Sequence, residues 1–134
     1  MSGDTDLARL LASMSPVLIE GVFVFASVEP GRDLAGVDVV MQFREAEGLT
    51  LVLRREDAMA QAIAADYPCR MITLNVHSSL EAVGFLAVIT RALAADGISV
   101  NAVSAFYHDH LFVPEARAAD AMAVLERLAA TGAA

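Results

Sequence analysis

The chain has 134 residues, of which 57% are hydrophobic and 19% are charged, and its formal net charge is -8. This length and composition fit one compact domain, or two small modules that share a core, and they exclude an intrinsically disordered chain. A negative net charge repels both a phosphate backbone and an anionic lipid surface. We therefore expect neither nucleic acid nor a membrane as a partner.

Cysteine usage and the start of the chain indicate the compartment. Cys69 is the only cysteine, so an intrachain disulfide is impossible and a reducing compartment is expected. The first six residues are acidic and lack the basic and apolar regions of a secretory signal. The most apolar run, residues 82–89, is too short to span a bilayer. We expect a cytoplasmic protein.

The first third of the chain predicts one helix and one strand. Apolar residues at helical spacing predict a short helix over residues 7–14, which ends before Pro16. Residues 22–27 form a compact apolar run that predicts a buried strand. Residues 31–38 carry little periodicity and are expected to form a loop.

The next segment predicts a hairpin and a helix. Residues 39–43 and 49–53 are rich in β-branched and aromatic residues, and the turn between them ends at Gly48. A helix is expected to follow from Arg54 and to stop at Tyr67 and Pro68. Its predicted buried face is Ala58, Met59, Ala62 and Ile63.

The second half predicts a strand over residues 71–76, followed by an amphipathic helix that Gly97 ends as a left-handed cap. Alternation then predicts a strand over residues 98–106, and a further strand is expected over 110–113. The predicted apolar stripe of the amphipathic helix is Leu80, Val83, Leu86, Ala87, Thr90, Leu93 and Ala94.

A final helix follows, with Pro114 in its first turn. Its predicted buried face is Ala118, Ala121, Met122, Leu125 and Leu128. The residues Asp-Ala-Met-Ala at 57–60 recur at 120–123, each time after an apolar strand. Two copies of one supersecondary unit explain this repeat, although chance repetition in an Ala-rich chain would also produce it.

Several of these segments resemble an ACT domain, a small regulatory module that binds small molecules. The resemblance rests on Val83 and Gly84 ahead of the helix, on residues 93–101 across its end, and on residues 107–114. The resemblance is strongest from about residue 70 onward. There the chain is similar to the ACT domains of aspartate kinases and of cytosolic arginine sensors. The chain departs from many ACT domains where Val83 replaces the usual proline before the glycine.

The resemblance implies an α+β, ferredoxin-like βαββαβ fold made of two interlocking ACT-like halves. We expect a degenerate N-terminal half over residues 1–66 and a C-terminal ACT domain over residues 67–134. The second half alone supplies three strands, so the fourth must come from a strand of the first half, such as residues 22–27, or from a partner chain that covers the open edge. A homodimer is the expected assembly.

The turn over residues 77–84 is the first candidate binding site. Backbone N–H groups at a helix start bind a carboxylate, and Gly84 allows a ligand to approach the backbone. Ser78 and Glu81 also have the spacing of a capping box, which would use the same N–H groups and close the turn to ligands. The resemblance to ACT domains favours the open turn, because ligands of that family commonly lie against it.

The turn around residues 107–109 is the second candidate. An amino acid needs an acceptor for its ammonium group, and Asn101, Asp109 or Glu81 could supply one, although Asn and Asp also stabilise turns without any ligand. Phe85, Phe106 and Tyr107 would pack on the ligand or in the core. The predicted ligand-binding residues are Ser78, Ser79, Glu81, Val83, Gly84, Phe85, Asn101, Tyr107, His108 and Asp109.

No catalytic constellation, cofactor motif or metal site is predicted. His108 and His110 share one face of a strand, where both could bind a metal ion. Apart from His77, the sequence has no group of His, Cys or Glu residues at a spacing that would supply the further metal ligands. Cys69 lacks a Cys-x-x-Cys partner, and a buried thiol is the expected state.

These observations favour a non-enzymatic sensor or regulatory protein that binds an amino acid at the junction of ACT halves or of subunits, and that acts on a protein target in another chain. A structural or protein-interaction module without a ligand is the alternative. A small metal-dependent enzyme that uses the histidines is the third hypothesis.

Overall fold

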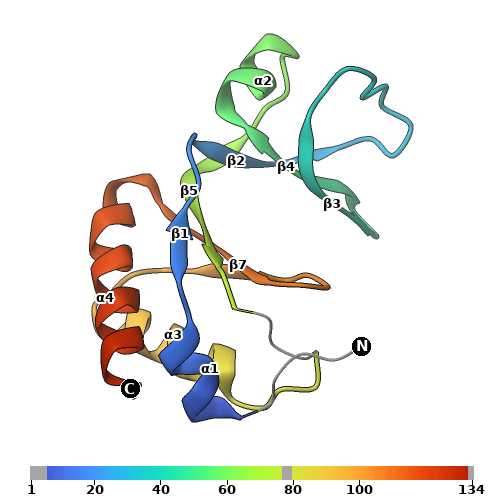
Figure 1. Ribbon diagram of the computed structural model, residues 1–134. Coiled ribbons are helices and arrows are strands. Elements are labelled where there is room, and N and C mark those ends of the chain that lie inside the picture. Colours follow the sequence, from blue (N-terminus) through green and yellow to red (C-terminus); the bar gives the residue numbers. More distant parts are fainter. Residues whose placement is uncertain (1–5, 77–79, 133–134) are drawn as a thin grey trace. The chain divides into compact units, whose positions relative to one another are not determined.

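The computed structural model describes residues 6–76 and 80–132, and the chain divides into two compact units (Figure 1). Unit 1 comprises residues 1–20 and 70–134, and unit 2 comprises residues 21–69. The chain therefore begins in unit 1, forms unit 2, and then returns. Residues from both predicted halves of the sequence meet in unit 1, and the division into halves at residues 66 and 67 stays a prediction.

Unit 1 is an antiparallel sheet with helices on one face. Its strands follow the order β1-β5-β7-β6, and the helices α1, α3 and α4 lie together on the same side of β1, β5 and β7 (Figure 1). The elements are α1 (Leu7–Ser13), β1 (Pro16–Leu18), the later residues of β5 (Asp66–Leu74), α3 (Phe85–Ala95), β6 (Asn101–Ser104), β7 (Asp109–Pro114), the 3-10 helix η1 (Glu115–Arg117) and α4 (Ala118–Thr131).

The fourth strand of this sheet is β1. Pro16 to Leu18 pair with Leu74 to Ile72 of β5, so a strand from the first half of the chain completes the sheet as predicted, although it is β1 and not the strand at residues 22–27. Three residues are too few to show a strand pattern in the sequence, and Pro16 ends the preceding helix at the same place.

Helix α3 begins later than predicted. Its buried residues are Phe85, Ile89 and Leu93, which recur every four residues on one face. Of the predicted stripe only Leu93 is buried. Leu80 is 68% exposed and Val83 is 83% exposed because both precede the helix, and Ala87 and Ala94 are exposed on the helix itself. In α4 the buried residues are Ala118, Ala121, Val124, Leu125 and Leu128, which confirms the predicted face except that Val124 replaces the half-buried Met122.

Unit 2 consists of β2 (Phe23–Val28), β3 (Val39–Glu45), β4 (Gly48–Arg54), α2 (Arg55–Ala60) and the first residues of β5. Its strands follow the order β3-β4-β2-β5. The predicted hairpin is confirmed, and residues 29–38 between β2 and β3 form neither helix nor strand, as expected. The unit has a small core of its own, formed by Val24, Ala26, Leu49, Leu51, Leu53, Ala58 and Ile63.

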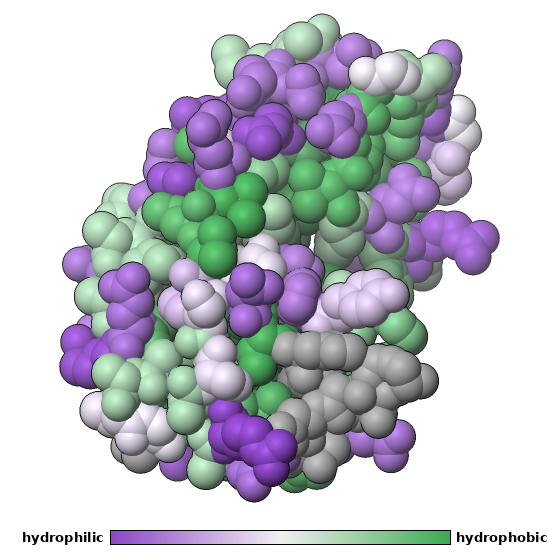
Figure 2. Space-filling view, in the orientation of Figure 1, coloured by the Kyte–Doolittle hydropathy of each residue, from purple (hydrophilic) through white to green (hydrophobic). Residues whose placement is uncertain are grey.

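Helix α2 is shorter than the sequence pattern predicts. It ends at Ala60, and Tyr67 and Pro68 belong to β5 rather than to a helix end. Only Ala58 of the predicted face is buried within the helix, and Met59 is 75% exposed. Large hydrophobic residues also reach the surface of this unit at Val40 and Phe43, and hydrophobic surface is visible in the space-filling view (Figure 2).

Helices α2 and α3 end in the same backbone motif with different residues. After α3, Gly97 N–H donates to the carbonyl of Ala94 and Ile98 N–H donates to that of Leu93, with Gly97 at φ 69°. This is a Schellman motif, and it confirms the predicted left-handed cap. After α2 the equivalent bonds run from residues 62 and 63 to residues 59 and 58, but the left-handed position is Ala62, at φ 54°.

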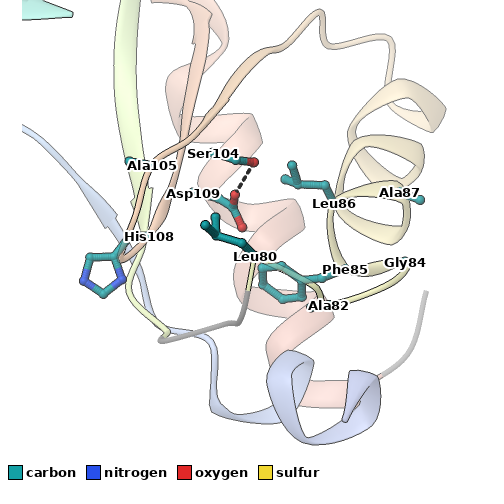
Figure 3. A pocket seen from close by; sticks show the side chains of 10 residues that line it. All are labelled: Leu80, Ala82, Gly84, Phe85, Leu86, Ala87, Ser104, Ala105, His108 and Asp109. Carbon is teal, nitrogen blue, oxygen red and sulfur yellow. Dashed lines mark hydrogen bonds between the residues drawn. The ribbon is translucent and has the colours of Figure 1, made fainter. Parts of the chain in front are cut away.

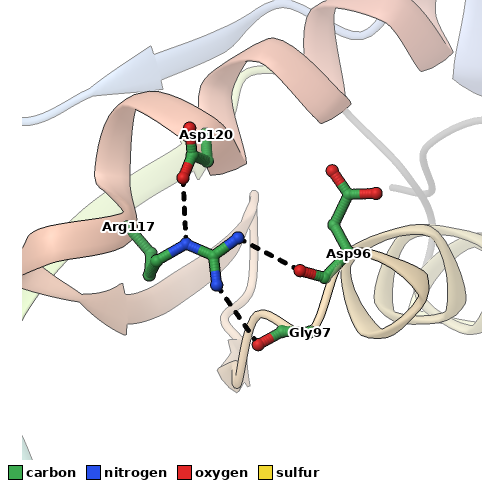
Figure 4. A network of polar contacts seen from close by, with 4 residues as sticks. All are labelled: Asp96, Gly97, Arg117 and Asp120. Atoms are coloured by element: carbon green, nitrogen blue, oxygen red, sulfur yellow. Dashed lines mark hydrogen bonds and ion pairs between the residues drawn. The ribbon is translucent and has the colours of Figure 1, made fainter.

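Arg117 ties the end of α3 to the start of α4 (Figure 4). Its guanidinium donates to the carbonyl oxygens of Asp96, at 3.1 Å, and of Gly97, at 3.4 Å, and its Nε donates to Asp120 Oδ2 at 2.9 Å. These carbonyls follow the last turn of α3, where the helix dipole favours a cation. One side chain therefore fixes the axis of α3 from its C-terminal end.

Candidate functional site

The N-terminus of α3 opens onto a pocket in unit 1 of about 140 Å³ (Figure 3). The pocket lies between the start of α3 and the turn that joins β6 to β7. It is lined by Leu80, Ala82, Gly84, Phe85, Leu86, Ala87, Ser104, Ala105, His108 and Asp109.

The start of α3 presents backbone donors to this pocket. Gly84 is the N-cap at φ 90°, a conformation that glycine adopts without a steric cost, and it offers no side chain to cap the helix. The first bond from the cap runs from Val88 N–H to Gly84 carbonyl, so the N–H groups of Phe85, Leu86 and Ala87 precede the ladder and have no partner within it. The positive end of the helix dipole lies here as well.

The capping-box hypothesis for this turn is wrong. A capping box would place Glu81 in the first turn of the helix, but Glu81 lies in a turn ahead of α3, which begins at Phe85. The predicted cap residue Ser78 lies outside the described residues, as does Ser79. The helix start is therefore not closed in the way that the capping box requires.

Asp109 brings a carboxylate to the same pocket. Its side chain points toward Leu80 and Phe85 (Figure 3), and it is 8% exposed, which makes it the one charged side chain found buried in the described ranges 6–76 and 80–132. Ser104 Oγ donates to Asp109 Oδ1 at 2.6 Å, because Ser104 is the partner of Asp109 in the β6–β7 register. A buried carboxylate with a neutral donor is better stabilised by a cation, and a ligand can bring one.

His108 belongs to the pocket lining, and both histidines form hydrogen bonds with β5 or the residues just after it. The imidazole of His108 points away from the other labelled side chains, and its Nδ1 donates to the carbonyl of Val76 at 3.3 Å (Figure 3). His110 Nδ1 lies 3.0 Å from Thr73 Oγ1. Burial lowers the pKa of His110 below its ordinary value, His108 lowers it further, and Asp109 partly opposes both.

Four of the predicted site residues line the pocket, namely Gly84, Phe85, His108 and Asp109, and a ligand-binding role for any of them stays a prediction. Four others do not line it: Glu81, Val83, Asn101 and Tyr107. The ring of Tyr107 packs edge-to-face on Phe106 at 4.9 Å, in an exposed turn.

Sequence reasoning missed Ser104, which holds Asp109, and also the small and aliphatic walls of the pocket. An antiparallel register across the short turn at residues 105–108 would have placed Ser104 opposite Asp109.

Within residues 6–76 and 80–132 no group of three or more His, Cys, Asp and Glu residues could hold a metal ion. Burial raises the pKa of the Cys69 thiol to about 12, and its Sγ donates to the carbonyl of Phe23, so this thiol is a poor nucleophile. No helix among the described residues is both long and apolar enough to cross a membrane.

The fold is an α+β module of tandem repeats, with a small pocket at the start of a helix. Two models of the ACT domain match the chain, one over residues 2–70 and the other over residues 66–127. The chain belongs to the ACT domain family.

Several solved structures are similar to this chain. A Vibrio cholerae protein of unknown function, described as a possible transport protein, is 42% identical, with a TM-score of 0.84 over 92% of this chain and 95% of that one. A protein from Agrobacterium tumefaciens is 18% identical, with a TM-score of 0.71 over 87% and 89%.

The regulatory subunit of aspartate kinase from Thermus thermophilus, in its ligand-free form, is 11% identical, with a TM-score of 0.67 over 88% of this chain and 97% of that one. The last two show a shared fold. A search of the curated proteins finds no match.

Proposed function

We propose that this protein is a non-enzymatic regulatory module that binds a free amino acid in the pocket at the N-terminus of α3. The observation that carries the proposal is the meeting of two opposite charge preferences in one small pocket. The helix start attracts a carboxylate, and the buried carboxylate of Asp109 attracts a cation. An α-amino acid carries both groups on adjacent atoms.

The two ends of the ligand are bound by different parts of the fold. The ligand carboxylate accepts hydrogen bonds from the first-turn N–H groups of α3, where Gly84 leaves the backbone open. The ligand ammonium donates to Asp109, whose orientation is set by Ser104. Membership of the ACT family supports the proposal, because ACT domains are typically regulatory modules that bind amino acids.

The regulatory effect of ligand binding is passed to other protein chains. β6 pairs only with β7 among the described strands, so a sheet edge is available for a second copy of the chain, and we propose a homodimer. A cytoplasmic location fits the single cysteine. The ligand would act on a protein target by favouring one arrangement of the assembly, which requires that it contact two arrangements differently.

The test is a thermal-shift screen against the twenty amino acids, followed by calorimetric titration of each hit. A ligand at 100 times its dissociation constant stabilises the folded state by about 2.7 kcal/mol, which a small protein shows as a clear rise in Tm. Asp109→Asn keeps the shape and the hydrogen bond with Ser104 but removes the charge, and it should weaken binding at least tenfold, since hydrogen bonds to charged groups are worth about 1.5–3 kcal/mol.

Asp96→Asn is the matched control, because Asp96 is an exposed carboxylate at the opposite end of α3. Unchanged affinity in Asp109→Asn, or equal losses in both variants, would exclude Asp109 as the ammonium acceptor.

A protein-interaction module without a ligand is the second candidate. It is favoured by exposed large hydrophobic residues of unit 1, namely Val17, Leu80, Val83, Phe106 and Tyr107. Silence across the whole amino-acid panel would select this candidate over the first.

A further inference from the structure

The carboxylate proposed as the ammonium acceptor lies between two histidines in the sequence, so this inference rests on the function proposed above. Asp109 is the first residue of β7, with His108 before it and His110 after it. Successive residues of a strand point to opposite faces of the sheet. Asp109 shares its face with Leu111, which belongs to the core beneath the helices, so His110 points to the face opposite α1, α3 and α4 (Figure 1).

The surroundings of His110 contain one acid and one further base. On β5, Thr73 Oγ1 lies 3.0 Å from His110 Nδ1, and on β6 the register partner of His110 is Val103; neither neighbour titrates. The ring of His108 lies 6.4 Å from that of His110, edge-to-face. In the part of the chain that the structure describes, the titratable groups that act on His110 are His108 and Asp109.

Asp109 couples the pocket to His110. Burial and His108 lower the pKa of the His110 imidazole, whereas the negative charge of Asp109 raises it. An ammonium group bound to Asp109 would offset that negative charge, so His110 would bind a proton less readily. Linkage makes the effect reciprocal, because a proton on His110 must then weaken the binding of the ammonium group by the same factor.

We propose that a proton on His110 and the ammonium group of the bound amino acid compete for the charge of Asp109, so that acid weakens binding and binding releases a proton. His110 is half-buried, so water screens this competition. Two unit charges about 7 Å apart in a dielectric like that of water change an affinity by a factor of about three. The loss develops below about pH 6.5, because burial holds the pKa of His110 below its ordinary value.

The coupling is measured first without an amino acid. NMR spectra follow the imidazole signals of the parent chain and of Asp109→Asn between pH 8 and pH 5, and His110→Gln assigns the signal of His110. Because Asp109→Asn removes a negative charge, it should lower the pKa of His110 and move its titration to lower pH. An unchanged titration would overturn the coupling, whether or not the protein binds an amino acid.

Titration calorimetry then uses the amino acid that gives the largest rise in Tm among the twenty. The parent chain should bind it about threefold more weakly at pH 5.5 than at pH 7.5. At pH 6 the measured heat should differ between phosphate and Bis-Tris buffers, which take up the released proton with different enthalpies. His110→Gln should abolish both effects. His77→Gln is the matched control and should keep both, since His77 is the remaining histidine and lies outside the described residues.

The outcomes separate this inference from the proposed function. If no amino acid binds, the proposed function fails and the competition fails with it. If Asp109→Asn abolishes binding, but the parent chain and His110→Gln lose affinity equally in acid, the proposed function stands and the competition is overturned. A loss in acid that disappears in His77→Gln and persists in His110→Gln would also overturn it.

Discussion

Replacing Ala62 with glycine should stabilise the protein, and replacing Gly97 with alanine should destabilise it by a similar amount. Both residues occupy the left-handed position of a Schellman motif, at φ 54° and φ 69°. An L-residue in this conformation costs about 1–2 kcal/mol, whereas glycine adopts it freely. Glycine also has greater freedom in the unfolded chain, which offsets about 0.4–1 kcal/mol of the gain. We therefore expect a net change of about 1 kcal/mol at each site.

The assay is urea unfolding at equilibrium, with the midpoint shifted and the slope unchanged. A Cβ on residue 97 would meet no heavy atom within 4 Å, so the loss at that site would come from the backbone alone. Ala60→Gly is the control for Ala62→Gly: it lies in the last turn of α2, where φ is helical, and glycine there should cost about 0.5–1 kcal/mol. Destabilisation by Ala62→Gly, or equal effects of glycine at residues 60 and 62, would refute the reasoning.

Two further predictions concern a cation and a histidine of unit 1. Arg117→Ala should lower the free energy of unfolding by about 1–2 kcal/mol, since it removes hydrogen bonds to two carbonyls at the end of α3. Asp120→Ala should lower it by less than about 1 kcal/mol, because it breaks only an exposed ion pair. Urea unfolding compares both with Arg127→Ala, an exposed arginine of α4, and equal effects of all three changes would contradict the role of the carbonyls. Because burial lowers the pKa of His110 below 6.5, the unfolded chain takes up this proton more readily, so stability should fall as pH drops below about 6.5 and level off below the folded pKa. His110→Gln should remove that part of the pH dependence between pH 8 and 5, and an unchanged profile would show that another group causes it.

The sequence predicted the end of an element correctly where a periodic pattern stopped at a glycine. The helix before Gly97 and the hairpin around Gly48 follow this rule, because each glycine has a positive φ, at 69° and 156°. The pattern was misleading where the backbone turned without a glycine. Ala62 is a strong helix former by type, so nothing in the sequence shows that it leaves the helix.

The same reasoning explains which of the predicted residues line the pocket. Gly84 and Asp109 could be predicted from the types of residue that helix starts and turns require. Asn101 could not be excluded by type, but its position decides its direction: it lies three residues from Ser104 along β6, so the two side chains point to opposite faces. The late start of α3 at Phe85 was not visible, because Leu80 and Val83 continue the helical spacing into a segment that is not helical.

The two repeats of this chain are unequal at one position, and this affects the form of any dose response. Unit 1 places α3 between β5 and β6, whereas unit 2 places the irregular residues 29–38 between β2 and β3. Unit 2 therefore has no helix start equivalent to the one in the proposed pocket, and in the described residues 6–76 and 80–132 only α3 provides such a start. A single site saturates hyperbolically whatever its affinity, because cooperativity requires coupled sites. A sharp threshold in ligand concentration would then arise only from the coupling of pockets on separate chains, so an assembly of copies, rather than the fold of one copy, would determine how steeply the protein responds.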